Sequence, residues 1–244
     1  RDNDAAMIIR QRTWLRIAIG AAAALALAGL AWWAARGTSP TTPPAPARGS
    51  GEAADGSGVC SDPDACFQLG IERMHAGDGS GSLAAFDRGC DLGDSTGCLN
   101  AGIAWLDRDD AARAVARFRK GGDLDDPNAG NELGLAYRRG WGVAVDLDHA
   151  RRLFSDACDR GRARACANLS AMYEQGAGVA PDPHRAFELS QRACDTDPLD
   201  AMTCRQTAEH LGSGDGTPQD LRRAASYMAK ACDRGDGDAC AREK

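Results

Sequence analysis

The chain has 244 residues, of which 26% are charged and 5% aromatic, and its formal net charge at pH 7 is −6. From Cys60 onward it carries 31 acidic and 23 basic side chains, a net charge of −8. This balance argues against nucleic acid as a partner, because binding to phosphates needs a basic surface. The low aromatic content and the many small residues suit closely packed helices.

The N-terminal segment predicts a membrane anchor. Residues 17–35 are 19 consecutive residues without a charge, and as a helix they span roughly 28 Å, close to the apolar core of a bilayer at about 30 Å. Three arginines precede them: Arg10, Arg12 and Arg16. Since basic residues favour the cytoplasmic side, we expect residues 1–16 to be a short cytoplasmic N-terminus and residues 17–35 to be one transmembrane helix, a signal anchor.

A cleaved signal peptide is the alternative interpretation, although its apolar region is usually only about 7–15 residues long. Residues 37–59 are rich in Pro, Gly and Ser and predict a linker that holds the folded part away from the membrane. We therefore expect a single-pass inner-membrane protein whose C-terminal domain is periplasmic, or a secreted protein if the N-terminal segment is removed.

The ten cysteines fall into five close pairs, which are Cys60 and Cys66, Cys90 and Cys98, Cys158 and Cys166, Cys194 and Cys204, and Cys232 and Cys240. Cys158 and Cys194 are 36 residues apart, and Cys194 and Cys232 are 38 apart. One period before Cys158 and Cys166 stand Gly122 and Gly130, so both cysteines are missing together. Pairs that are present or absent as units predict five disulfides and no free thiol.

Disulfides persist in oxidising compartments, which agrees with export of the C-terminal region. A zinc site is the alternative for paired cysteines. It is disfavoured because no two cysteines have the two-residue spacing of zinc ligands, and the histidines are not interleaved with them. The four histidines are His75, His149, His184 and His210. We expect neither a metal nor a cofactor.

A repeat follows the same period. Self-similarity at this spacing is typical of stacked repeats. Each unit reads as two helices, a shorter first helix ended by glycines and a second helix that begins near Asp146, Asp182 or Asp220. Matched positions include Leu133 and Leu169, Tyr137 and Tyr173, Gly140 and Gly176, Gly142 and Gly178, and Ala150 and Ala186.

The second helix carries one apolar stripe at helical spacing: Ala150, Leu153, Phe154, Ala157 and Cys158. A cysteine at its end would pair with a cysteine at the start of the next helix. Each such disulfide closes a loop of about nine residues, and the loop-entropy model predicts that it stabilises the fold by roughly 2.6 kcal/mol. Residues 60–244 thus predict an all-α fold, an α-solenoid of about five helix-turn-helix units stapled by disulfides.

Several of these residues resemble a known family. The pattern is Leu133-Gly134, Tyr137, Gly140, Gly142-Val143, Asp146, Ala150, Phe154, Ala157 and Gly161. It resembles the Sel-like repeat (SLR), a relative of the tetratricopeptide repeat, over about residues 61–244 and most closely over 130–190. Ser170 departs from the Leu-Gly pair, and residues 98–122 lack the Gly-x-Gly-Val turn.

The paired cysteines resemble the secreted, cysteine-rich subgroup of that family. The resemblance implies a right-handed solenoid with a concave face used for protein–protein contact. It also suggests a second possibility, since some cysteine-rich members are described as β-lactamases or penicillin binders. The Ser-x-x-Lys motif of serine enzymes of that kind is absent, because Ser226 and Lys230 are one residue too far apart. We find no catalytic residue and expect no enzyme.

Two tryptophans are candidate partner-binding residues, Trp105 and Trp141. Trp141 stands in a turn between two glycines, where an indole has little to pack against inside its own unit. An aromatic side chain exposed in this way can anchor a partner.

The sequence therefore favours an exported, membrane-anchored adaptor that binds a protein or peptide partner. The alternatives are weak β-lactam binding or hydrolysis and docking onto peptidoglycan. The sequence indicates no oligomeric state.

Overall fold

The computed structural model describes residues 60–197 and 200–242. The predicted N-terminus 1–16, transmembrane helix 17–35 and linker 37–59 lie outside these ranges. Within them, no helix is both long enough and apolar enough to cross a bilayer. The chain divides into two units, residues 1–50 and 51–244, and all described residues belong to the second.

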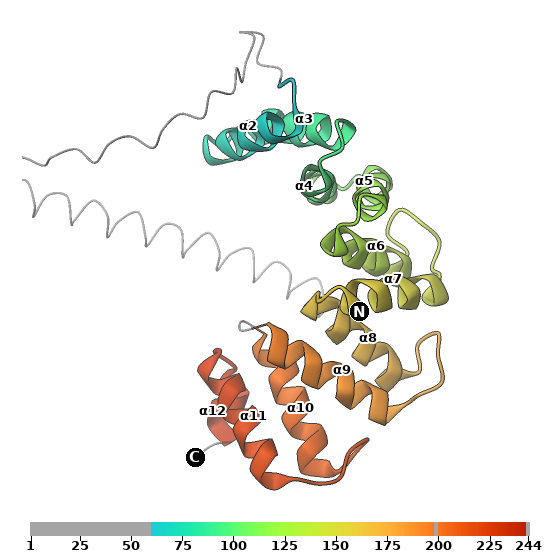
Figure 1. Cartoon of the computed structure of the whole chain (residues 1–244), viewed down its shortest axis with the longest axis vertical. Helices are drawn as coiled ribbons and strands as arrows, with labels where there is room; N and C mark the ends of the chain where they lie inside the picture. Colours follow the sequence, from blue (N-terminus) through green and yellow to red (C-terminus); the bar gives the residue numbers. More distant parts are fainter. Residues whose placement is uncertain (1–59, 198–199, 243–244) are drawn as a thin grey trace, which may run out of the picture. The chain divides into compact units, whose positions relative to one another are not determined.

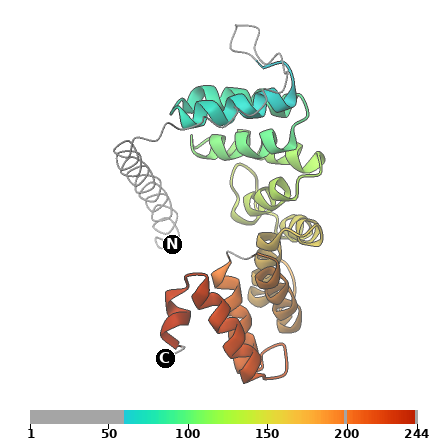
Figure 2. The same cartoon turned by 60° about the vertical axis from the view of Figure 1, so that its left-hand side comes forward.

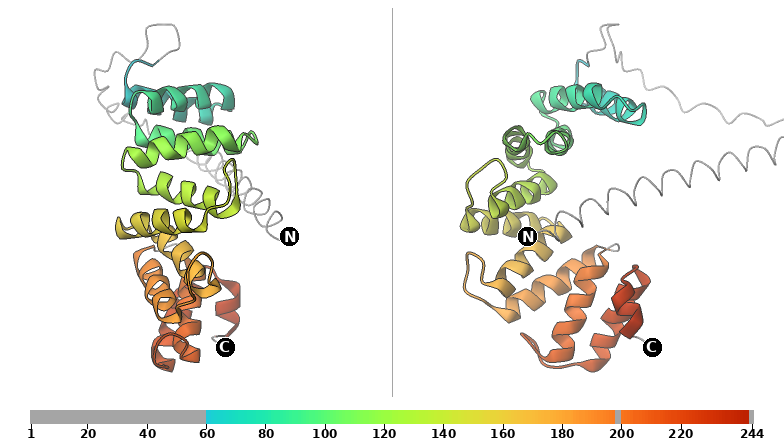
Figure 3. Two further views of the ribbon diagram at one scale, coloured as in Figure 1. Left: turned by 90° about the vertical axis from the view of Figure 1, so that its right-hand side faces the viewer. Right: turned by 180° about the vertical axis from the view of Figure 1, so that it is seen from behind.

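The described ranges form eleven helices and no strand. In chain order they are α2 (Pro63–His75), α3 (Gly79–Asp91), α4 (Ser95–Leu106), α5 (Ala111–Asp123), α6 (Pro127–Arg139), α7 (Leu147–Asp159), α8 (Ala163–Gln175), α9 (Pro183–Thr196), α10 (Ala201–Ser213), α11 (Leu221–Asp233) and α12 (Gly237–Arg242). Consecutive helices pair into five hairpins, from α2/α3 to α10/α11, and each hairpin stacks on the next (Figures 1, 2 and 3). The predicted all-α solenoid of five units is confirmed.

The predicted difference in length between the two helices of a unit is wrong. In the units α6/α7 and α10/α11, each helix has 13 residues. The first helix is longer than expected because it begins well before Leu133, at Pro127. Its first turns bury Ala129 and Gly130 next to the preceding unit, and this packing makes those residues part of the helix.

Aspartates cap almost every helix. The second helices begin after Asp146, Asp182 and Asp220 as predicted, and each carboxylate accepts a hydrogen bond from the backbone N–H three residues later. First helices use the same device, so nine of the ten helices α2–α11 have an aspartate N-cap; only α8 begins after an arginine, Arg162. A carboxylate there satisfies free N–H groups and favours the positive end of the helix dipole. Nine of the 31 acidic residues of the domain therefore have a structural role.

The Gly-x-Gly turn that joins the two helices of a unit has two separate roles. Its first glycine, such as Gly140 or Gly176, ends the first helix in the left-handed conformation. Its second glycine, such as Gly178 with a φ of 71°, lies against the start of the previous second helix, where an added Cβ would collide with Leu147. The turn therefore packs successive units together.

A second glycine position lets the two helices of one unit approach closely. A Cβ on Gly134 would lie 2.7 Å from the ring of Phe154. In the next unit Ser170 replaces the glycine, and the position equivalent to Phe154 is Ser190. The Ser170 hydroxyl donates to the backbone carbonyl of Ala186 at 2.7 Å. The larger Ser170 is therefore accommodated because this unit has Ser190 where the previous unit has the Phe154 ring.

The five predicted disulfides are confirmed, and the structure leaves no cysteine free. Their S–S distances are 1.99 to 2.02 Å. The bonds join Cys60 to Cys66, Cys90 to Cys98, Cys158 to Cys166, Cys194 to Cys204, and Cys232 to Cys240.

Four of the disulfides link the end of a second helix to the start of the following first helix, as expected. The bond at Cys60 instead ties the preceding segment to α2. The junction from α5 to α6 has no bond. There a Cβ on Gly122 would lie 4.0 Å from the Cα of Gly130.

Replacing both Cys158 and Cys166 by alanine should lower the free energy of unfolding by about 2–3 kcal/mol, because the unfolded chain gains the freedom of the opened loop. The helical circular dichroism should persist, since the α5/α6 junction stands without a bond. Chemical denaturation followed by circular dichroism measures both. Complete loss of helicity in the double variant would contradict this account.

The reverse change offers a matched control. Cysteines introduced together at Gly122 and Gly130 should oxidise to a sixth disulfide and raise the same free energy, because these positions have open space around them. Failure of the two thiols to pair would show that the α5/α6 junction differs in geometry from the bonded ones.

Gly178→Ala should destabilise the protein more than Gly161→Ala. Both glycines have positive φ, 71° and 85°, but only Gly178 has a neighbour within reach of a Cβ. The strained backbone costs about 1–2 kcal/mol in each variant, and overpacking against Leu147 adds about 1–3 kcal/mol at Gly178. Equal loss of stability in thermal denaturation of the two variants would disprove the role of Gly178 in packing the units.

Candidate functional site

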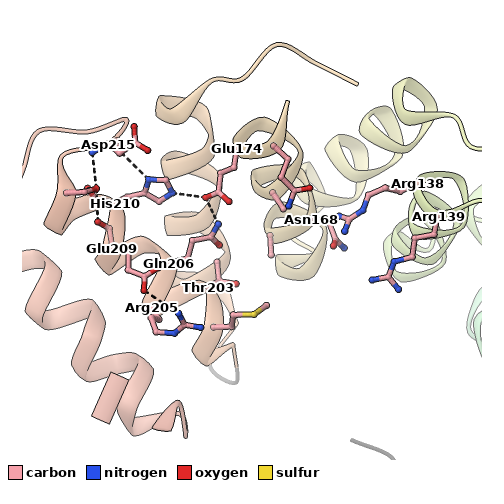
Figure 4. A pocket seen from close by; sticks show the side chains of 15 residues that line it. Arg138, Arg139, Asn168, Glu174, Thr203, Arg205, Gln206, Glu209, His210 and Asp215 are labelled. Carbon is pink, nitrogen blue, oxygen red and sulfur yellow. Dashed lines mark hydrogen bonds and ion pairs between the residues drawn. The ribbon is translucent and has the colours of Figure 1, made fainter. Parts of the chain in front are cut away.

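An open groove of about 670 Å³ runs across the first helices of three successive units, α6, α8 and α10, and reaches the turn after α10 (Figure 4). Most of the side chains that line it are polar or charged. The only strongly exposed large apolar side chain in it is Met202, with 59% of its surface accessible. The site therefore suits a polar ligand that carries an occasional apolar group.

A row of amide and acid side chains repeats along the first helices. Equal register in stacked units places such residues on the same face. One residue of this kind stands two positions before the close-packed glycine or its replacement in every unit: Gln68, Asn100, Glu132, Asn168 and Gln206. Of these, Asn168 and Gln206 line the groove. We did not expect this row, although its recurrence is visible in the sequence once the units are aligned.

The side-chain NH₂ group of each groove amide is hydrogen-bonded within the protein, whereas its side-chain carbonyl is not. Asn168 donates to the side-chain oxygen of Asn131 at 2.9 Å, and Asn131 donates to Glu132 at 3.1 Å. Gln206 donates to Glu174. Within the described ranges, no donor reaches the side-chain carbonyl of Asn168 or Gln206. These two carbonyls can accept hydrogen bonds from a ligand.

A partly buried ion pair forms one wall of the groove. His210, which is 8% exposed, lies with Nε2 2.8 Å from Oε1 of Glu174. Its Nδ1 lies 3.1 Å from the backbone carbonyl of Asp215. The hydrogen bond to Glu174 raises the pKa of His210, and the same bond lowers the pKa of Glu174. The pair links α8 to α10 and holds two lining side chains in fixed positions.

The arginines of the groove differ in whether they are paired with acids. Arg205 on α10 pairs with Asp236 at 2.8 Å and with Glu209 at 3.3 Å. Arg138 and Arg139, at the end of α6, form no ion pair with the residues that the structure describes. The α6 end of the groove is therefore cationic.

Two residues near these α6 arginines, Trp141 and Glu132, affect their surroundings. Arg139 stacks on Trp141, with its guanidinium carbon 4.7 Å from the ring centre. Glu132 lies one to two turns earlier on the same helix, and burial raises the pKa of its carboxyl even though Arg139 opposes the shift. Among the described residues, no ion pair joins this half-buried acid to Arg138.

The two candidate tryptophans lie outside this groove. Trp105 donates to the carboxylate of Asp87 at 3.2 Å and is covered by Arg113, 4.4 Å from its ring centre. Trp141 packs against a cluster drawn from α5 and α6, so it contacts the unit before its own. Both indoles are half-buried. Their role in partner binding stays a prediction.

The four histidines do not gather. Each stands on a different helix, and within the described ranges no three His, Cys, Asp or Glu side chains are grouped so as to hold a metal ion.

Glu174→Gln should destabilise the protein most near pH 5–6. The raised pKa of His210 means that its contribution is present below its ordinary value of 6.5 and is lost as the pH rises through the raised pKa. The lowered pKa of Glu174 means that its contribution is present above 4.5 and is lost as the pH falls through the lowered pKa. The loss should be about 1–2 kcal/mol in this window and smaller at about pH 9.

The control is Glu188→Gln, because Glu188 forms a histidine pair that is exposed, 3.7 Å from His184. It should cost less than about 0.5 kcal/mol at either pH. Denaturant titrations at both pH values measure the difference. A cost of Glu174→Gln that does not vary with pH would refute the charged pair.

Comparisons with known proteins agree with this architecture. The Sel1 repeat family model matches residues 63–84, 127–161, 163–195 and 201–236, which together make up just over half of the chain. No curated protein matches this chain. The unit α4/α5, which lacks the Gly-x-Gly-Val turn, lies in the unmatched part.

Two solved structures show the same fold. A protective antigen of uropathogenic Escherichia coli strains, which displays an SLR fold, matches with a TM-score of 0.69 at 21% identity, over 74% of this chain and 40% of the antigen. A Sel1 repeat protein from Oxalobacter formigenes matches with a TM-score of 0.66 at 23% identity, over 72% of this chain and 73% of its own. This chain thus spans well under half of the antigen.

Sel1 repeats generally mediate protein–protein interaction. The paired helices, the repeated glycine contacts and the family match lead to one conclusion: this chain is a member of the Sel1 repeat family.

Proposed function

We propose that this protein is a membrane-anchored adaptor of the cell envelope, whose repeat domain lies outside the cytoplasm and binds a protein or peptide in the groove across α6, α8 and α10. The observation that carries the proposal is the groove itself, with its unused side-chain carbonyls on Asn168 and Gln206. Anchoring rests on the uncharged stretch 17–35, and the location outside the cytoplasm rests on the five disulfides.

An extended peptide fits the chemistry of this groove. Its backbone N–H groups can donate to the free carbonyls of Asn168 and Gln206, which stand on neighbouring units. Exposed Met202 offers a flexible apolar contact for a side chain of the peptide. The Glu174–His210 pair fixes the wall between them, so little ordering is needed when the ligand binds.

The contacts of His210 favour binding over catalysis. Both of its ring nitrogens are engaged, one by the carboxylate of Glu174 and the other by the carbonyl of Asp215. The hydroxyl of Ser213, also in the lining, donates to the backbone carbonyl of Glu209 at 2.9 Å. Neither group is placed to activate the other, whereas a general base must reach the proton that it removes.

A photo-crosslinking amino acid in place of Gln175 tests the proposal. Gln175 lines the groove and is exposed, so the larger side chain can be accommodated there. Irradiation of intact cells, followed by purification of the protein under oxidising conditions, should yield a discrete crosslinked protein that mass spectrometry identifies.

The matched control places the same amino acid at Arg152, which is exposed on the second helix α7. The same crosslinked band from both positions would show capture without selectivity. Crosslinking to cell-wall material alone would transfer the proposal to peptidoglycan, and no product from Gln175 would remove the groove as a protein site.

A further inference from the structure

Arg138 is a half-buried arginine that the described fold does not pair with an acid. It lies at the end of α6, in the lining of the groove, and no carboxylate of the described residues lies within ion-pair distance of it. Arg162 and Arg234 are also half-buried without an ion pair among the described residues, but neither lines the groove, and Arg234 donates to backbone carbonyls such as that of Cys194.

Two other partly buried arginines of this domain are neutralised: Arg117 lies 2.8 Å from Asp87, and Arg205 lies 2.8 Å from Asp236. Arg138 differs from both because its own fold supplies no acid for it.

Removing an arginine from water without a counter-charge costs free energy. Burial lowers the pKa of Arg138, and the neighbouring Arg139 lowers it further. The repeat does not require a cation at this position, because the equivalent residues in the other units are Met74, Leu106, Glu174 and Gly212. The last turn of α6 favours a cation through the helix dipole, but it supplies no carboxylate for the Arg138 guanidinium. An anion brought by a ligand would supply one.

We infer that Arg138, assisted by Arg139, binds a carboxylate of the peptide segment that occupies the groove. This inference rests on the proposed function and names the chemistry of its ligand. A planar guanidinium binds a carboxylate through two parallel hydrogen bonds, which gives direction as well as affinity. The carboxylate would set the register in which the peptide lies along α6, α8 and α10.

The surrounding charges leave room for a single carboxylate and oppose a polyanion. The acid in the middle of the groove, Glu174, lies 2.8 Å from His210, whose raised pKa favours the charged pair. In Figure 4, Asn168 lies between the two α6 arginines and the Glu174–His210 pair. A peptide with its carboxylate at Arg138 therefore passes the free carbonyl of Asn168 next. The domain as a whole carries −8, so long-range repulsion disfavours heavily anionic ligands.

The carboxylate has two possible sources, an acidic side chain or the C-terminus of the partner. Four fluorescent peptides distinguish them. All share one sequence of about ten residues, long enough to cross the groove when extended at about 3.3 Å per residue. This sequence varies only at one central position, which is glutamate or glutamine, and each version has a free or an amidated C-terminus. Binding to the purified, oxidised full-length protein in detergent is followed by fluorescence anisotropy.

The expected result is tighter binding of peptides that carry a carboxylate, and an affinity about tenfold lower in Arg138→Gln. A preference that follows the side chain identifies an acidic motif, and one that follows the C-terminus identifies terminal recognition. The control is Arg222→Gln, which removes the same charge from an exposed position on α11 and should leave all affinities unchanged. The thermal stability of Arg138→Gln should not fall, because an unpaired half-buried charge is removed.

Three results would overturn the inference: equal affinity for all four peptides, equal losses in the two arginine variants, or no binding of any peptide in the millimolar range. None of these depends on the photo-crosslinking result. A protein crosslinked at position 175 together with no carboxylate preference would keep the groove as a protein site and refute the arginine site alone.

Discussion

The groove depends on the junctions between units, because its three walls come from three different hairpins. Each junction is a close contact between the end of one second helix and the start of the next first helix. Between α5 and α6 the contact is so tight that a Cβ on Gly121 would lie 2.7 Å from the Cβ of Ala129. Elsewhere a disulfide spans it, as from Cys194 to Cys204, where Arg234 also donates to the carbonyl of Cys194. These short-range constraints set the angle at which successive first helices face a ligand.

Small residues also allow a close contact inside the hairpins, between the two helices of one unit. Where a glycine lies under a phenylalanine ring, as with Gly134 and Phe154, the helices approach to a distance that a methyl group would prevent. The pair Ser170 and Ser190 shows that the family pattern is a constraint on combined volume rather than on one residue. The unit α4/α5 follows the same rule through its Gly102, which faces a phenylalanine ring, although its turn departs from the pattern.

Charge in this domain has two distinct uses. Aspartates serve as helix caps along the whole described chain, so part of the net negative charge has a structural role. The informative charges are those without an internal function. The structure pairs Arg117, Arg192 and Arg205 with acids, whereas Arg138 has none among the described residues. A local cationic site inside a negative domain favours a short ligand with one well-placed carboxylate.

The features that could be predicted from the sequence are those set by local chemistry. The disulfide partners, the caps at Asp146 and Asp182 and the hairpin pattern all involve residues within about one unit of each other, so periodicity and spacing reveal them. Family membership follows from the same pattern. The anchor at 17–35 lies outside the described residues and stays a prediction.

Only the tertiary structure identified the groove and its chemistry. Glu174 and His210 are 36 residues apart, and their contact depends on the packing angle between helices rather than on any local preference.

The same holds for the pairing of charges. The sequence shows that Arg138 and Arg205 both belong to first helices of the repeat. Glu209 is a local i,i+4 partner of Arg205 on α10. However, only the packed structure brings Asp236 to Arg205 and no acid of the described residues to Arg138, since such pairs are decided by which side chains the stacked units place within reach.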